Sequence, residues 1–221
     1  MTPTAATRQA QYSSIGRAPT SALPAELWLL ILEQTSIQEA SHLWLTVRRV
    51  SPQFRDLVER LFSSSYLAAF AMTLSLPRRD PTSGALLWPG TPIPRAQMSM
   101  SFYGLSSDGR YIHFRSPSVL SEGTRAESVE ELKNTSVLPL KRLEAAAVWV
   151  HFTQNQLTGL QMHVPRHVSW NGEQGAWIWK LEWKNLITQF YEKKREQRLA
   201  KAPIRPMPGR QRWLKRGHEG A

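Results

Sequence analysis

The most regular pattern of apolar positions in this 221-residue chain follows a Ser-Pro pair at residues 51–52. In the stretch SPQFRDLVERLF, apolar side chains recur at positions 54, 57, 58, 61 and 62, which is the spacing of one helical face. Ser51 is a suitable N-cap, and Pro52 suits the first turn because its missing N–H would be unpaired there anyway. The pattern therefore predicts a helix that begins at residue 52 and buries one side.

Two further helices are predicted upstream. The stretch LPAELWLLILEQ, residues 23–34, has Leu23, Leu27, Leu30 and Ile31 on one helical face, with Trp28, Leu29 and Leu32 beyond that face. A helix that is apolar on most sides needs more cover than one neighbour can give. Helical spacing of apolar residues also predicts a helix over residues 39–49. Three short helices make a small module with a thin core, so we expect it to lean on something else.

Downstream, alternation replaces the helical period. Met98, Met100 and Phe102 alternate before a Ser-Asp-Gly turn at residues 107–109, which predicts a hairpin. The stretches AAAVWVHF and TGLQMHV predict two more strands, and helical spacing predicts a closing helix over about residues 180–199. The stretch YLAAFAMTLSL fits a strand or the end of a helix, and the polar stretch from residue 116 to 137 is predicted to be a loop with a short helical turn. The predicted fold class is α+β, with a mostly antiparallel β region between the helical module and the C-terminal helix.

Composition divides the chain into four parts. Residues 1–22 are predicted to be a disordered leader, residues 23–65 the helical module, residues 66–200 the β-rich region closed by a helix, and residues 201–221 a basic disordered tail. The net charge is +11, but residues 192–221 alone carry ten Lys or Arg and three Glu, so the body is close to neutral. The tail could act as a nuclear-import address or bind a polyanion through charge.

Several kinds of chemistry are not expected. The chain has no cysteine, which excludes disulfides and thiolate metal sites. His163 and His167 have ligand spacing, but Pro165 between them opposes the helix that would align them, so no metal is expected. We find no catalytic motif and expect no catalytic residues, no cofactor and no enzyme activity.

The aromatic and apolar runs are interpreted as parts of a packed core rather than as a binding platform or a membrane span. The Trp-rich stretch WIWKLEW could form a stacking platform for carbohydrate or bases, but core packing is favoured. The longest apolar run has about a dozen residues, short of the roughly twenty that span a bilayer. We therefore expect no membrane association and a cytoplasmic or nuclear location.

Residues 23–65 resemble an F-box, and their sequence is most similar to that of F-box proteins of filamentous fungi. F-box modules begin with Leu-Pro-x-Glu-Leu/Ile, continue to an Ile-Leu pair and later carry Val-Ser-x-x-Phe/Trp-Arg. The matching stretches here are LPAEL from residue 23, IL at residues 31–32 and VSPQFR from residue 50.

The resemblance implies a function by docking. F-box modules bind the Skp adaptor of Skp–cullin–F-box ubiquitin ligases, and the region that follows holds a protein substrate, here unknown. The partner-binding residues that it implies are Leu23, Pro24, Glu26, Leu27, Ile31, Leu32, Val50 and Phe54. The alternative is a basic-tailed nuclear or nucleic-acid-binding protein whose helical module packs only internally. Nucleic acid is the less favoured partner.

Overall fold

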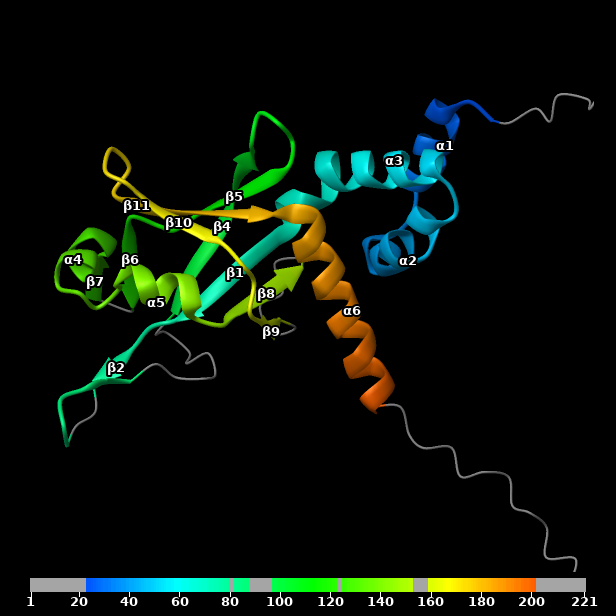
Figure 1. The fold of residues 1–221 in the computed structure, drawn as a ribbon. Helices are drawn as coiled ribbons and strands as arrows, with labels where there is room; N and C mark the ends of the chain where they lie inside the picture. Colours follow the sequence, from blue (N-terminus) through cyan, green and yellow to red (C-terminus); the bar gives the residue numbers. More distant parts are fainter. Residues whose placement is uncertain (1–22, 80–81, 88–96, 123–124, 153–158, 202–221) are drawn as a thin grey trace, which may run out of the picture.

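The computed structural model describes residues 23–79, 82–87, 97–122, 125–152 and 159–201. The predicted leader, residues 1–22, and all but the first residue of the predicted tail lie outside this part of the chain. Figure 1 shows an α+β fold in which a helical N-terminal module and a long C-terminal helix pack at one end of an antiparallel sheet.

The helical module runs from α1 to the first strand. Its helices and turns are α1 (Ala25–Glu33), η1 (Ile37–Glu39), α2 (Ala40–Leu45), η2 (Val47–Arg49), α3 (Pro52–Leu61), η3 (Phe62–Tyr66) and η4 (Leu67–Ala69). The helix predicted at residue 52 is confirmed with its cap, because the Ser51 hydroxyl accepts a hydrogen bond from the Phe54 N–H at 3.2 Å. The helix predicted over residues 39–49 is instead two segments. Thr46, at φ −116° and ψ −63°, ends α2, and the tighter turn η2 leads the chain to Ser51.

The main sheet has seven strands, and every neighbouring pair is antiparallel. Their spatial order is β10 (His167–Asn171), β11 (Ala176–Glu182), β5 (Tyr111–Arg115), β4 (Gln97–Leu105), β1 (Phe70–Ser75), β8 (Val148–Phe152) and β9 (Leu160–Met162). The ambiguous stretch after residue 65 contains both alternatives, since helical turns continue to Ala69 and β1 begins at the next residue.

The hairpin predicted around residues 107–109 is confirmed as β4 and β5. Gly109 adopts a left-handed φ of 66°, which a glycine reaches without a steric penalty, and its N–H donates to the Ser106 carbonyl at 2.8 Å. The Asp108 carboxylate accepts from the Arg110 N–H at 3.0 Å, so the side chain also holds the turn.

Two hairpins were not predicted from the sequence. The polar stretch predicted to be a loop forms β6 (Val119–Glu122) and β7 (Arg125–Ser128), followed by the expected short helix as α4 (Val129–Asn134). The pairing of β10 with β11 was also missed, and the last helix, α6 (Trp183–Lys201), begins three residues later than predicted. Remaining short elements are β2 (Arg78–Arg79), β3 (Leu86–Leu87) and α5 (Leu140–Ala145).

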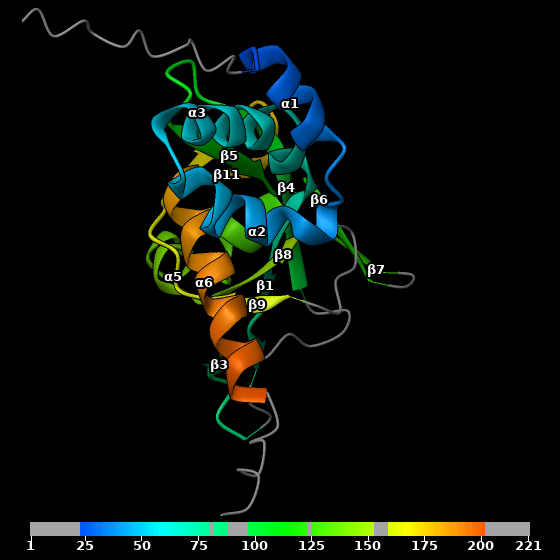
Figure 2. The ribbon, with the colours of Figure 1, turned by 90° about the vertical axis from the view of Figure 1, so that its right-hand side faces the viewer.

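One continuous core joins the module to the sheet. Figure 2 shows α2 beside α6. Ring contacts join several fully buried aromatic side chains where these helices meet the sheet. Members of this cluster with 2 % or less exposure include Trp44, Phe62, Phe70, Trp183, Phe190 and Tyr191. Residues 23–65 therefore do not pack as a separate body.

Candidate partner-docking surface

The first turn of α1 is set by Pro24. Its carbonyl accepts hydrogen bonds from the N–H groups of Leu27 and Trp28 at 3.1 and 3.2 Å. Glu26 lies exposed in the first turn, where a negative charge is favourable next to the positive end of the helix dipole. The start of the helix fixes which apolar residues turn inward.

The inner side of α1 packs on the module. Trp28 and Leu29 are half-buried against the core, and Leu32 retains only 7 % of its exposure. The Trp28 ring meets the Phe54 ring of α3 edge to face, with 5.1 Å between the ring centroids. This contact joins the two helices at the beginning of α3.

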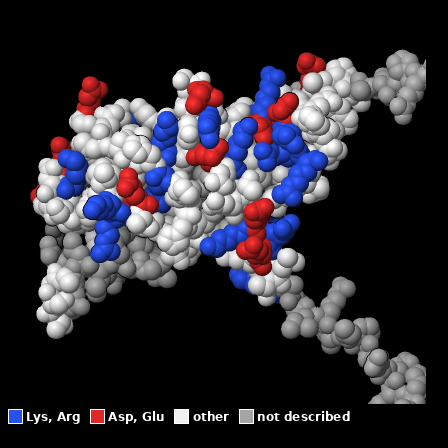
Figure 3. Space-filling view, viewed as in Figure 1, with Lys and Arg blue, Asp and Glu red and all other residues white. Residues whose placement is uncertain are grey.

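The opposite side of α1 faces solvent. Leu23, Leu27, Leu30 and Ile31 retain 42 %, 45 %, 54 % and 50 % of their exposure, and we call these four residues the outer row. Val50, next to the α3 cap, is 66 % exposed. In Figure 3 residues other than Lys, Arg, Asp and Glu form a patch at the tip of the α1 end, with acidic and basic side chains close beside it. Scattered exposed leucines are ordinary on protein surfaces, but here three exposed apolar residues share one face of α1 and Leu23 lies just before the helix.

The helices behind the outer row pack tightly against one another and against α6. Leu57, Val58 and Leu61 of α3 are buried, and the Trp44 indole of α2 donates to the Thr188 hydroxyl of α6 at 3.0 Å. The Trp44 ring also lies 5.7 Å from the ring of Trp183, the first residue of α6, centroid to centroid. The module is therefore attached to the C-terminal helix through both packing and a hydrogen bond.

Charge contributes to the same attachment. Glu59 on α3 accepts hydrogen bonds from Arg48, with Nε at 2.8 Å, and from the Nζ of Lys184 on α6. Burial acts to raise the pKa of Glu59, but the hydrogen bonds and charges of these two partners outweigh it, so its pKa lies below the usual carboxyl value. Arg48 also lies over the Trp44 ring, 4.3 Å from its centroid.

The structure separates the sequence-predicted residues into three groups. Leu23, Pro24, Glu26, Leu27, Ile31 and Val50 are exposed. Phe54 is half-buried and holds Trp28. Leu32 is buried, which corrects its place among the expected contact residues, because its side chain supports α1 from inside.

Two exposed apolar residues were not among the predicted contacts. Leu30 belongs to the outer row by its spacing of seven from Leu23, a signal that the sequence already carries. Ile37, in the turn η1, is 40 % exposed and has no periodic neighbour that would have marked it.

The described residues were also compared with what a stacking platform, a metal site and a membrane-spanning helix would need. Trp177, Trp179 and Trp183 are 4 %, 0 % and 2 % exposed, which confirms core packing over a stacking platform. Among the described residues, no group of three or more His, Asp or Glu side chains is arranged to hold a metal ion. None of the helices in that part of the chain combines the length and apolar character needed to cross a membrane.

Comparisons of this chain with protein-family models, with curated proteins and with solved structures found no match.

Proposed function

We propose that this protein is a substrate receptor that docks on the Skp-type adaptor of a cullin ubiquitin ligase, without catalysis of its own. The outer row supports the proposal most directly. Leu27, Leu30 and Ile31 follow the helical period of α1, whose other side is already packed, and Leu23 lies just before this helix. All four are therefore available to a partner without any unfolding. The F-box-like residue pattern indicates the class of that partner, a Skp-type adaptor.

The arrangement of the molecule fits this role. The helical module sits at one end of the sheet, and α4, α5 and the β6–β7 hairpin lie at the other (Figure 1). The far end is therefore the part of the molecule that would present a protein substrate. The shared core at the module–sheet junction would hold the adaptor-binding and substrate-holding ends in a fixed relation.

The alternative, a nuclear or nucleic-acid-binding protein, requires a module that packs only internally. The exposed outer row favours docking over that alternative, because internal packing alone gives no reason for Leu23 and three large apolar residues of α1 to stay exposed. Five of the ten Lys and Arg residues in the segment 192–221, on which the alternative depends, lie beyond the described residues.

A matched pair of variants tests the docking. We expect Leu27→Ser/Ile31→Ser to weaken capture of a Skp-type adaptor by at least tenfold in a purified binding assay, since each side chain would be buried at the interface. Both residues are about half exposed, so the free protein should keep its melting temperature within a few degrees.

The control carries the same kind of change elsewhere. Leu140 and Leu199 are also exposed apolar residues, at 45 % and 68 %, but they lie on α5 and α6. Leu140→Ser/Leu199→Ser should bind the adaptor as the unaltered protein does. Equal binding by all three proteins, or no binding by the unaltered chain, would show that the outer row is not an adaptor surface.

A further inference from the structure

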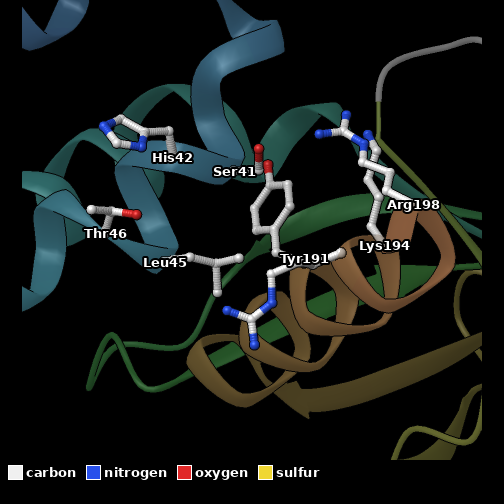
Figure 4. Close-up of a pocket in the computed structure, with 8 residues that line it drawn as sticks. Ser41, His42, Leu45, Thr46, Tyr191, Lys194 and Arg198 are labelled. Carbon is white, nitrogen blue, oxygen red and sulfur yellow. The ribbon is translucent and has the colours of Figure 1, made fainter. Parts of the chain in front are cut away.

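A cavity of about 250 Å³ opens between α2 and α6, away from the outer row. It is lined by Ser41, His42, Leu45 and Thr46 from α2 and the residue after it, and by Tyr191, Lys194, Arg195 and Arg198 from α6. The α6 residues have the spacing i, i+3, i+4 and i+7, which places them on the single face that looks towards α2. Figure 4 shows the Tyr191 ring extending from α6 towards Ser41.

The charge of this cavity is one-sided. Among the described residues, three cationic side chains line it and no carboxylate does. Within the described residues, none of Lys194, Arg195 and Arg198 has an ion pair, whereas the neighbouring Glu192 is 3.7 Å from Arg49. Like charges four residues apart on a helix repel, so the Lys194 and Arg198 pair costs stability unless an anion compensates. The pKa of Lys194 is lowered, first by burial and then by Arg198.

Tyr191 adds a second, independent observation. Its side chain is 1 % exposed, and its hydroxyl is buried without a hydrogen-bond partner. A buried hydroxyl of this kind normally has a partner, because leaving it unpaired costs about 1–3 kcal/mol. The Ser41 and Thr46 hydroxyls in the same lining are further possible donors. The lining of the cavity therefore combines positive charge with hydroxyl groups.

We propose that this cavity binds a small phosphate-bearing ligand. A phosphate group has several strong acceptor oxygens and up to two negative charges, which suit three cations and a set of hydroxyl donors. Arginine binds phosphate through two parallel N–H groups, and lysine acts as a point charge beside it. The volume admits inorganic phosphate or a diphosphate but is below the usual size of a drug-like pocket. The inference does not depend on adaptor docking.

The test uses the full chain at constant ionic strength. We expect isothermal titration to show saturable one-to-one binding of inorganic phosphate, and tighter binding of pyrophosphate because its charge is larger. Lys194→Gln/Arg198→Gln should lower the affinity for both probes by at least tenfold.

Two controls separate the cavity from general surface charge. Arg60→Gln/Lys141→Gln removes two exposed cations outside the cavity and should leave the affinity within twofold. Tyr191→Phe should weaken phosphate binding severalfold while the melting temperature stays equal or rises, because it deletes an unpaired buried hydroxyl. Undiminished binding after Lys194→Gln/Arg198→Gln, equal losses in both charge variants, or no saturable binding at all would overturn the proposal.

Discussion

At the scale of single residues, Glu59 of α3 holds two partners that lie on other elements. It receives Arg48 from η2 and Lys184 from α6, and its own side chain is only 13 % exposed. Arg48 is 23 % exposed, whereas Lys184 is 46 % exposed and is therefore better solvated. The Arg48 contact should thus contribute the larger part of any stabilisation.

Replacement of this carboxylate should be measurable. We expect Glu59→Gln to lower the free energy of unfolding by about 1–3 kcal/mol, since a partly buried arginine loses its ionic acceptor. Chemical denaturation checks the value. Glu182→Gln offers the control, because Glu182 meets Arg110 at 3.4 Å in an exposed pair, which should be worth less than about 1 kcal/mol. A similar loss of unfolding free energy in both variants would contradict the claim that the Glu59 contacts stabilise the fold more than an exposed ion pair does.

The same residue predicts a pH dependence. Because the pKa of Glu59 is lower in the folded than in the unfolded chain, its contribution is complete above the ordinary carboxyl pKa of about 4.3. The contribution is lost as the pH falls through the folded pKa. The difference in unfolding free energy between the unaltered protein and Glu59→Gln should therefore shrink when denaturation is repeated below about pH 4. A difference that is constant between pH 3 and pH 6 would show that protonation of Glu59 is not involved.

At the scale of elements, the periodicity of apolar residues predicted where the helices lie better than it predicted which face of each helix meets the core. The spacing of apolar residues in α1 gave both of its faces, but an all-round apolar helix does not reveal which face meets the core. The sequence therefore could not show that Leu32 lies inside and Ile31 outside. The structure shows which side of α1 faces the module, because Trp28 packs against Phe54 of α3.

The strands divide in a similar way. The β4–β5 hairpin has both alternation and an Asp-Gly turn, so the sequence alone predicts it. The β6–β7 hairpin has mostly polar residues, which resemble a loop. In β11 the alternation of Trp177, Trp179 and Leu181 runs directly into the helical period at Trp183, so the boundary of α6 was placed too early.

The contact between α1 and α3 supports a prediction of its own. Phe54 is half-buried, so Phe54→Ala should cost about 1–2 kcal/mol, less than the roughly 3–5 kcal/mol of a fully buried phenylalanine. The loss should fall on α1, whose Trp28 would lack its neighbour. Hydrogen exchange should show faster exchange of the α1 amides and little change in β1. Uniform acceleration across the fold would contradict this local role.

At the scale of the whole molecule, the module and the sheet depend on α6. Helix α6 inserts Leu186, Ile187, Phe190 and Tyr191 into the common core, and these residues lie far along the chain from the module that they cover. The boundary suggested by composition at residue 65 therefore does not mark an independent folding unit. Composition cannot show this dependence, because it arises from contacts between distant segments.

The full chain should consequently unfold in a single cooperative transition, with far-ultraviolet and tryptophan signals that coincide. A fragment of residues 23–69 would expose the faces of Trp44 and Phe62 that Trp183 and Tyr191 cover in the intact protein. Because fewer than fifty residues bury too little surface to offset about 1–2 kcal/mol of backbone entropy per residue, we expect this fragment to be largely unfolded by circular dichroism. A fragment with native-like helix content and a cooperative melt would contradict this dependence. It would show that the module can fold without α6 and that the shared core only joins two stable parts.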